Sequence, residues 1–105
     1  MRNVPTKPIT KHQILQYMAK AEEFLNAATS SINEGMTVAG TSLAVHAGIS
    51  AADVISGVRL GKRSRGTDHM QAVALLEQAG KEGKTGSSIL KRLVALKPKA
   101  EYDPD

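Results

Sequence analysis

Residues 37–60 read TVAGTSLAVHAGISAADVISGVRL, and this stretch decides what the chain can fold into. It is apolar on most sides and dense in Gly, Ala and Ser, and its three glycines lower the local helix propensity. Such a helix must be held by its neighbours, while its small side chains let other helices approach closely. We therefore expect Thr37 to about Leu60 to form a helix at the centre of a bundle or along a dimer seam.

The composition of the whole 105-residue chain favours packed helices in one domain. Aromatic residues make up only 3%, so the core must come from Leu, Ile, Val, Met and Ala rather than from a sheet rich in aromatic residues. The absence of cysteine excludes disulfides and thiolate metal sites and fits a reducing cytoplasm. The first ten residues contain no apolar run, so we expect no signal peptide.

The segment before the central stretch predicts a long amphipathic helix. Thr10 and Gln13 have capping-box spacing. Apolar residues then recur at alternating steps of four and three, which indicates about six turns ending near Gly35; these are Ile14, Met18, Ala21, Leu25, Ala28 and Ile32. Residues 1–9 contain Pro5 and Pro8 without periodicity, so we expect a flexible, extended N-terminal arm.

The segment after the central stretch predicts two shorter helices. The first runs from Asp68 to about Ala79, and residues 80–86, which contain three glycines, are expected to form a flexible link. The second runs from Ser87 to Leu96, because Pro98 prevents continuation. Tyr102 is expected to fold back onto the helices. The predicted fold is thus an all-α, antiparallel up-down four-helix bundle over residues 10–102, with a short C-terminal tail that ends in residues 103–105.

The positive charge lies mostly in the second half of the chain. From Arg59 to Lys99 there are ten Lys or Arg residues and three acidic residues, about +7, although the whole chain carries only +4. Such a basic half is typical of proteins that bind the backbone of RNA or DNA. A solvated basic surface without a partner is the alternative.

The basic turn of residues 62–69, KRSRGTDH, holds the candidate functional residues. Thr67 or Asp68 can cap the helix that follows, which places His69 in its first turn. There the helix dipole and the free backbone N–H groups disfavour a charged imidazole. A neutral His69 beside Arg63 and Arg65 can accept a proton while the cations hold an anion, so the chemistry points to phosphate.

A polar stripe on the central helix is the second candidate feature. His46, Ser50 and Asp53 follow one another at steps of four and three, so they share one helical face. They form either a satisfied structural network or a surface that faces the basic turn and orients its groups. Metal binding is not expected, because the chain has no cysteine and the histidine spacing is poor for ligands.

The Arg63 to His69 spacing, with five residues between them on a turn between two helices, resembles the R-x(4–6)-H motif of the HEPN superfamily. Its context is similar as well, in AADVI at 51–55, in the Leu75-Leu76 pair and in KPKAEY at 97–102. SLAVHAG at 42–48 and GKRSRG at 61–66 resemble a small bacterial HEPN-like branch.

The resemblance implies a homodimeric helical bundle that acts as a metal-independent endoribonuclease without a cofactor. His69 would be the general base or acid, and Arg63 would hold the scissile phosphate. Arg65, Asp53 and His46 would support them. A toxin–antitoxin or stress setting in the cytoplasm, with a cognate antitoxin or a nucleotidyltransferase as partner, follows from the same resemblance.

Other functions remain open at this stage. The main alternative is a non-catalytic helical module that binds nucleic acid, a nucleotide or a protein through its basic face. DNA recognition by a helix-turn-helix is disfavoured, because the turn between the helices is long and flanked by glycine. Membrane insertion of residues 37–60 is disfavoured by His46 and Asp53 in mid-segment.

Overall fold

The computed structural model describes the backbone of residues 4–65 and 69–102 and the side chains of these residues up to Leu96. It is mostly helical and contains four helices and a two-stranded antiparallel sheet. The all-α expectation is therefore confirmed in its coarse form. The elements in chain order are β1 (Thr6–Pro8), α1 (Lys11–Asn33), α2 (Thr37–Leu60), β2 (Lys62–Ser64), α3 (His69–Leu76) and α4 (Gly80–Tyr102).

Helix α1 begins at Lys11, directly after its N-cap residue Thr10. The side chain of Thr10 accepts a hydrogen bond from the backbone N–H of Gln13 at 3.1 Å, and the Gln13 side chain accepts one from the backbone N–H of Thr10 at 2.9 Å. This is the predicted capping box. The chain then turns at Gly35, whose φ of +81° favours glycine, and returns as α2 alongside α1.

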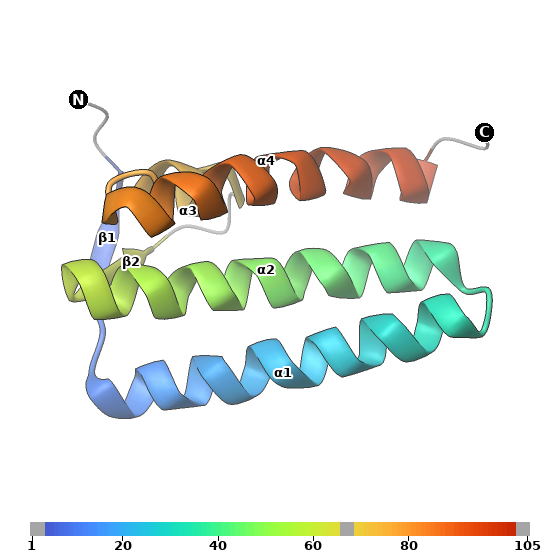
Figure 1. Ribbon diagram of the computed structural model, residues 1–105, viewed down its shortest axis with the longest axis horizontal. Helices are drawn as coiled ribbons and strands as arrows, with labels where there is room; N and C mark the ends of the chain where they lie inside the picture. The colour runs from blue at the N-terminus through green and yellow to red at the C-terminus, as the bar shows by residue number, and fades with distance from the viewer. Residues whose placement is uncertain (1–3, 66–68, 103–105) are drawn as a thin grey trace.

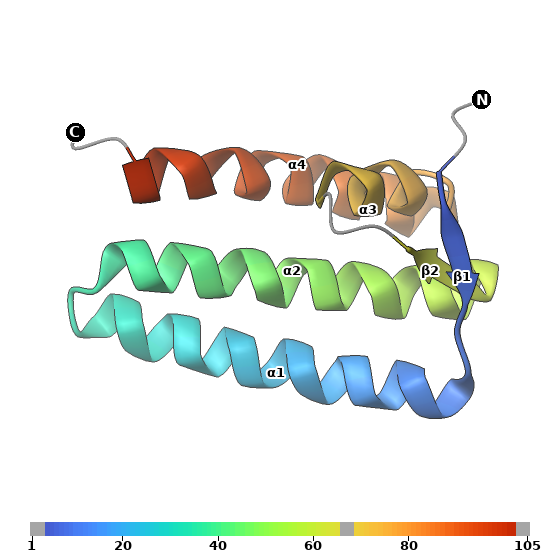
Figure 2. The same ribbon diagram turned by 180° about the vertical axis from the view of Figure 1, so that it is seen from behind.

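Helix α2 lies between α1 on one side and α3 with α4 on the other (Figures 1 and 2). Its glycines allow this close approach. A Cβ at Gly57 would lie 2.9 Å from Ile14 of α1, and a Cβ at Gly48 would lie 2.9 Å from Leu90 of α4. The predicted central position of the small-residue helix is therefore explained by packing on two sides.

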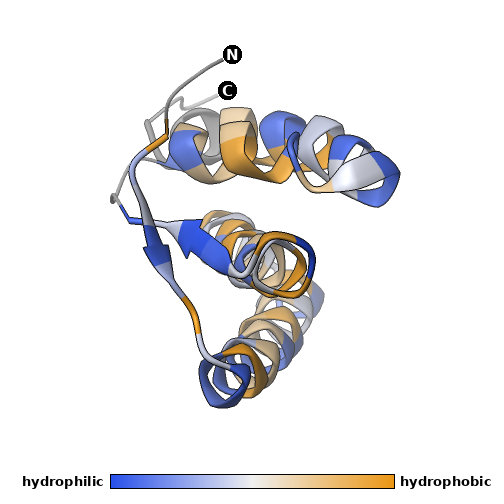
Figure 3. Ribbon diagram, turned by 90° about the vertical axis from the view of Figure 1, so that its left-hand side faces the viewer, coloured by the Kyte–Doolittle hydropathy of each residue, from blue (hydrophilic) through white to orange (hydrophobic). Residues whose placement is uncertain are grey.

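The hydrophobic core lies between α2, α3 and α4. Figure 3 shows the apolar sides of these helices turned toward one another. The buried cluster consists of Ala52, Val73, Leu76, Ala79 and Leu90. Complete burial of a leucine contributes about 2 kcal/mol, so this side of α2 holds the short helix α3 in place.

The N-terminal segment differs from the expected flexible arm, because Thr6–Pro8 pairs with Lys62–Ser64. The Arg65 N–H donates to the Pro5 carbonyl at 2.9 Å, and the Ile9 N–H donates to the Gly61 carbonyl at 3.3 Å. Strand β1 has no second neighbour in this sheet. An edge strand tolerates proline, because its outward-facing nitrogens need no partner.

The expected link at residues 80–86 is helical instead, so that prediction was wrong. Helix α3 ends at Leu76, a turn follows, and α4 begins at Gly80, whose φ is +79°. Gly83 lets α4 pack closely against the end of α3, since a Cβ at this position would collide with the Leu76 carbonyl. Tertiary contact here outweighs the low helix propensity of glycine.

Helix α4 also runs through Pro98 to Tyr102, which corrects the predicted end at Leu96 and the predicted tail. A proline inside a helix removes one backbone hydrogen bond. The backbone to Tyr102 is helical, while the Tyr102 side chain and residues 103–105 lie outside the described part of the chain.

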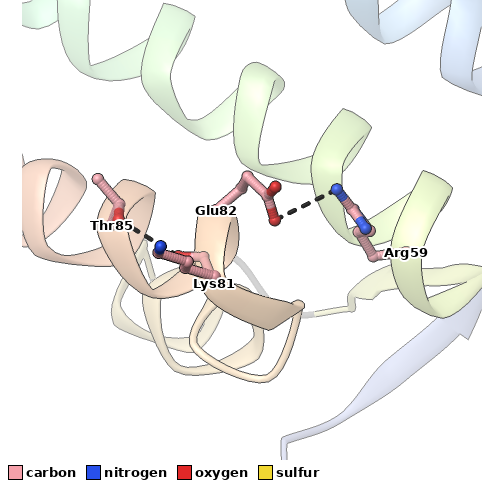
Figure 4. Close-up of polar contacts among 4 residues, drawn as sticks. All are labelled: Arg59, Lys81, Glu82 and Thr85. Carbon is pink, nitrogen blue, oxygen red and sulfur yellow. Dashed lines mark hydrogen bonds and ion pairs between the residues drawn. The ribbon is translucent and has the colours of Figure 1, made fainter.

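An ion pair joins α2 to the start of α4. Arg59 and Glu82 approach to 3.2 Å, and both side chains are more than half exposed. Figure 4 shows the two side chains pointing toward each other. Arg59 lies in the last turn of α2 and Glu82 in the first turn of α4. Each side chain is opposite in charge to the end of the helix dipole at which it lies, which is a favourable arrangement. An exposed pair of this kind contributes at most about 1 kcal/mol.

Candidate functional site

The site lies along the side of α2 that faces α1, β2 and α3. His46 of α2 stacks on Phe24 of α1, with ring centroids 5.3 Å apart and planes inclined by 29°. His69, the first residue of α3, meets the ring of His46 nearly edge-on, with centroids 6.0 Å apart. Two imidazoles from separate helices are thus brought into contact, and each is only partly buried.

A charged cluster lies further along the same side. Asp53 is buried, with 8% of its surface exposed. Burial raises the pKa of its carboxyl to about 6, although the nearby charges of Arg63 and Lys20 oppose the increase. The Arg63 guanidinium lies over the ring of Tyr17, 5.5 Å from its centroid, and donates to the Ser64 carbonyl at 3.0 Å.

The imidazole pair and the charged cluster belong to one strip. His46 and Asp53 are seven residues apart on α2, and Phe24 and Tyr17 are seven residues apart on the neighbouring α1. Seven residues of helix correspond to two turns, or about 10 Å along the axis. We call these residues, with Lys20, Arg63 and His69, the polar strip.

The structure thus brings together most of the residues that the sequence indicated. His46 lies against His69, and Asp53 lies beside Arg63, so the stripe on α2 does face the basic turn. Ser50, between His46 and Asp53, is buried. The Arg65 side chain is exposed, and its backbone N–H is bound to Pro5. The proposed caps Thr67 and Asp68 lie outside the described residues.

Three members of the polar strip were not indicated by the sequence reasoning, namely Tyr17, Lys20 and Phe24 of α1. Tyr17 and Phe24 are two of only three aromatic residues in the chain, and they share one helical face. The position of two rare aromatic residues on one helical face was the signal that could have indicated them. It was missed because the face was assigned by its aliphatic residues.

The strip supports two kinds of chemistry. Two adjacent imidazoles can accept and donate protons, and the Arg63 guanidinium, about two helical turns along the strip, can hold an anion. Within the described part of the chain, no group of three His, Cys, Asp or Glu side chains is placed to hold a metal ion.

A second cleft lies on the other side of α2. Gly48 and Ala51 are about 140–200° around the helix from His46, and they line an apolar groove of about 360 Å³ between α1 and α4. Leu25, which is 57% exposed, and Leu93 form its walls. The small-residue face and the basic turn of residues 62–69 are therefore on different sides of the helix.

Judged by length and composition only, helix α2 is long and apolar enough to cross a membrane. One third of its most apolar window is buried within the protein, and the helix carries Asp53 and His46 in its centre.

Comparison with known proteins gives no relative. The chain matches no protein-family model, no curated protein and no solved structure.

Proposed function

We propose that this chain is a HEPN-like, up-down four-helix bundle that binds RNA and cleaves it without a metal ion. The observation that carries the proposal is the contact of His46 with His69 in the same strip as Arg63 and Asp53. Proton-transfer groups and an anion-binding group are the two components that cleavage of a phosphodiester needs.

In the proposed reaction, the ribose 2′-oxygen attacks phosphorus and the bond from phosphorus to the 5′-oxygen breaks. One imidazole, His69, accepts the proton of the 2′-hydroxyl. The other, His46, donates a proton to the leaving 5′-oxygen. The products are a 2′,3′-cyclic phosphate and a 5′-hydroxyl, and DNA is not cleaved because it has no 2′-hydroxyl.

Arg63 would stabilise the charge that develops on the phosphoryl oxygens. Its guanidinium is held over Tyr17 and beside Asp53, so it is oriented before the substrate arrives. Such preorganisation is effective because no further reorganisation is needed during the reaction. Arg65, which is exposed next to Ser64, would contact a neighbouring phosphate.

The test is cleavage of a mixed RNA pool in EDTA by the wild type, His69→Ala, Arg63→Ala and His12→Ala. His12 is the matched control, because it is exposed in the first turn of α1 and away from the strip. We expect the wild type and His12→Ala to give 5′-hydroxyl products and the other two variants to lose the activity. Cleavage that survives in a folded His69→Ala would reject the mechanism.

The wider setting is proposed from the resemblance alone. It comprises a homodimer, the cytoplasm, a toxin–antitoxin or stress role, and a cognate antitoxin or a nucleotidyltransferase as partner. The apolar groove supports pairing of two copies through the small-residue face of α2, because its wall includes Leu25, which is more than half exposed.

A non-catalytic binding module is the second candidate, and one observation favours it. Arg63 already has two internal contacts, with the Tyr17 ring and the Ser64 carbonyl, and it also lies close enough to Asp53 to affect its ionisation. A side chain with such contacts can fix β2 on the bundle without taking part in catalysis. RNA binding that persists unchanged in His69→Ala, without cleavage by any variant, would support this function.

A further inference from the structure

Two cations from different parts of the chain lie over the ring of Tyr17. The Nζ of Lys20 lies 5.6 Å from the ring centroid, and the guanidinium carbon of Arg63 lies 5.5 Å from it. Lys20 is one turn after Tyr17 on α1, and Arg63 comes from β2. Both are close enough to Asp53 to affect its ionisation.

A third cation is added by β1. Lys7 is the cross-strand partner of Arg63 in the two-stranded sheet, so the two side chains leave the sheet on the same face. The Lys7 side chain is exposed. Like charges directly opposite each other are unfavourable in an antiparallel pair, and a bound anion would turn this repulsion into attraction.

The internal counter-charge is insufficient for this cluster. Among the described residues, two carboxylates stand against these cations, the buried Asp53, whose ionisation Lys20 and Arg63 affect, and the exposed Glu23, one turn after Lys20 on α1. Arg65, next to the same strand, adds a fourth positive charge at the surface. The cluster therefore keeps a net positive charge towards solvent.

We propose that Lys20 and Arg63, which lie over the ring of Tyr17, and Lys7, the cross-strand neighbour of Arg63, form a phosphate subsite for a single strand of nucleic acid. This inference deepens the proposed function, since the subsite would hold the strand beside the imidazole pair. The contribution of Lys7 makes β1 part of the site. The bonds of Pro5 to Arg65 and of Ile9 to Gly61 then keep β1 and β2 in register.

The ring arrangement favours a single strand over a duplex. Tyr17 lies near one end of the polar strip, and the Phe24–His46 stack lies about two turns along it. Partly exposed rings beside cations are the platform on which unpaired bases stack, whereas the bases of a duplex are stacked on one another and cannot reach such rings.

The subsite is tested by fluorescence anisotropy with a labelled twelve-nucleotide single-stranded RNA and a DNA of the same sequence, titrated at several NaCl concentrations. The variants are Lys7→Ala, Lys20→Ala, Tyr17→Ala and Tyr17→Phe. Lys91→Ala is the matched control, because Lys91 is an exposed lysine on α4. Helix α4 lies across α2 from α1, which carries Tyr17 and Lys20 (Figure 1).

We expect both lysine variants to bind RNA and DNA about 3- to 10-fold more weakly at low salt, with a salt slope reduced by about 0.7 each. Tyr17→Ala should weaken binding as well, whereas Tyr17→Phe and Lys91→Ala should match the wild type. Equal affinity and equal slope in Lys7→Ala, Lys20→Ala and Lys91→Ala would overturn the subsite, as would a wild type that binds neither strand.

The outcomes separate this inference from the proposed cleavage. Binding that depends on Lys7 and Lys20, without RNA cleavage by the wild type, retains the subsite and rejects the ribonuclease. Cleavage of RNA with an unchanged affinity in both lysine variants retains the ribonuclease and rejects the subsite.

Discussion

The ring of His46 on α2 contacts the ring of His69 on α3 nearly edge-on, at 6.0 Å between centroids. The two residues are 23 positions apart in the chain. Their contact depends on the packing of α3 against α2, so the core beneath them also sets the distance between the two imidazoles.

This contact predicts a specific role for His46. The variant His46→Phe keeps an aromatic ring against Phe24, worth about 0.5–1.5 kcal/mol, but cannot transfer a proton. We expect its melting temperature to stay near that of the wild type, while RNA cleavage falls by about 10²-fold or more. Product analysis together with circular dichroism measures both effects. Wild-type cleavage by His46→Phe would restrict His46 to a structural role.

A second prediction concerns the ionisation of Asp53. Because the folded state raises its pKa from 3.8 to about 6, the folded state binds the proton more tightly than the unfolded state does. Stability from this group is present below about pH 4 and is lost as the pH rises through about 6. The full shift corresponds to about 3 kcal/mol.

The variant Asp53→Asn cannot ionise, so it should be about 1–3 kcal/mol more stable than the wild type at pH 7.5 and similar at pH 4. Urea unfolding at the two pH values measures the difference. Glu82→Gln is the control, since Glu82 lies in an exposed pair with Arg59 whose loss should cost at most about 1 kcal/mol. A less stable Asp53→Asn at pH 7.5 would mean that the charge of Asp53 is needed to hold Arg63.

Local signals account for the parts of the fold that the sequence could predict. The capping pair of Thr10 and Gln13 and the periodic apolar residues after it are short-range features, and α1 begins where they indicate. The bounds of α2, Thr37–Leu60, agree with the prediction because Gly35 and Gly61 flank a segment made mostly of small and apolar residues.

Non-local contacts account for what the sequence did not show. Strand β1 forms by pairing with β2, in which Lys7 lies opposite Arg63, 56 residues later in the chain. A three-residue strand has too few positions to reveal an alternating pattern in the sequence. Gly83 was interpreted as a flexible residue because its contact with Leu76 cannot be seen locally. The meeting of Tyr17 with Arg63 has the same cause.

The glycines of α4 give a third prediction. In Gly83→Ala the new Cβ collides with the backbone carbonyl of Leu76, which cannot move without displacing α3. We expect a loss of about 3 kcal/mol and a melting temperature lowered by more than about 10 °C. Gly86→Ala is the matched control on the same helix, because its Cβ would meet only the flexible end of the Leu76 side chain at 3.3 Å.

Thermal unfolding followed by circular dichroism compares the two variants. Gly86→Ala should be neutral or slightly stabilising, since alanine favours a helix more than glycine does. If both variants unfold at the same temperature, then residues 80–86 do not pack as a helix against α3.

The last prediction concerns the apolar groove and the proposed homodimer. Leu25 lines the groove and is 57% exposed, whereas Leu15 is 56% exposed on the same helix and is not among the groove residues. Leu25→Glu places a charge in the groove, which is costly if a second copy covers it. Light scattering at tens of micromolar should show a dimer for the wild type and Leu15→Glu and a monomer for Leu25→Glu. Because the groove and the polar strip lie on opposite sides of α2, the monomeric Leu25→Glu should still cleave RNA. A monomeric wild type rejects the dimer, while a monomeric Leu25→Glu that has lost cleavage would mean that each site needs the partner subunit.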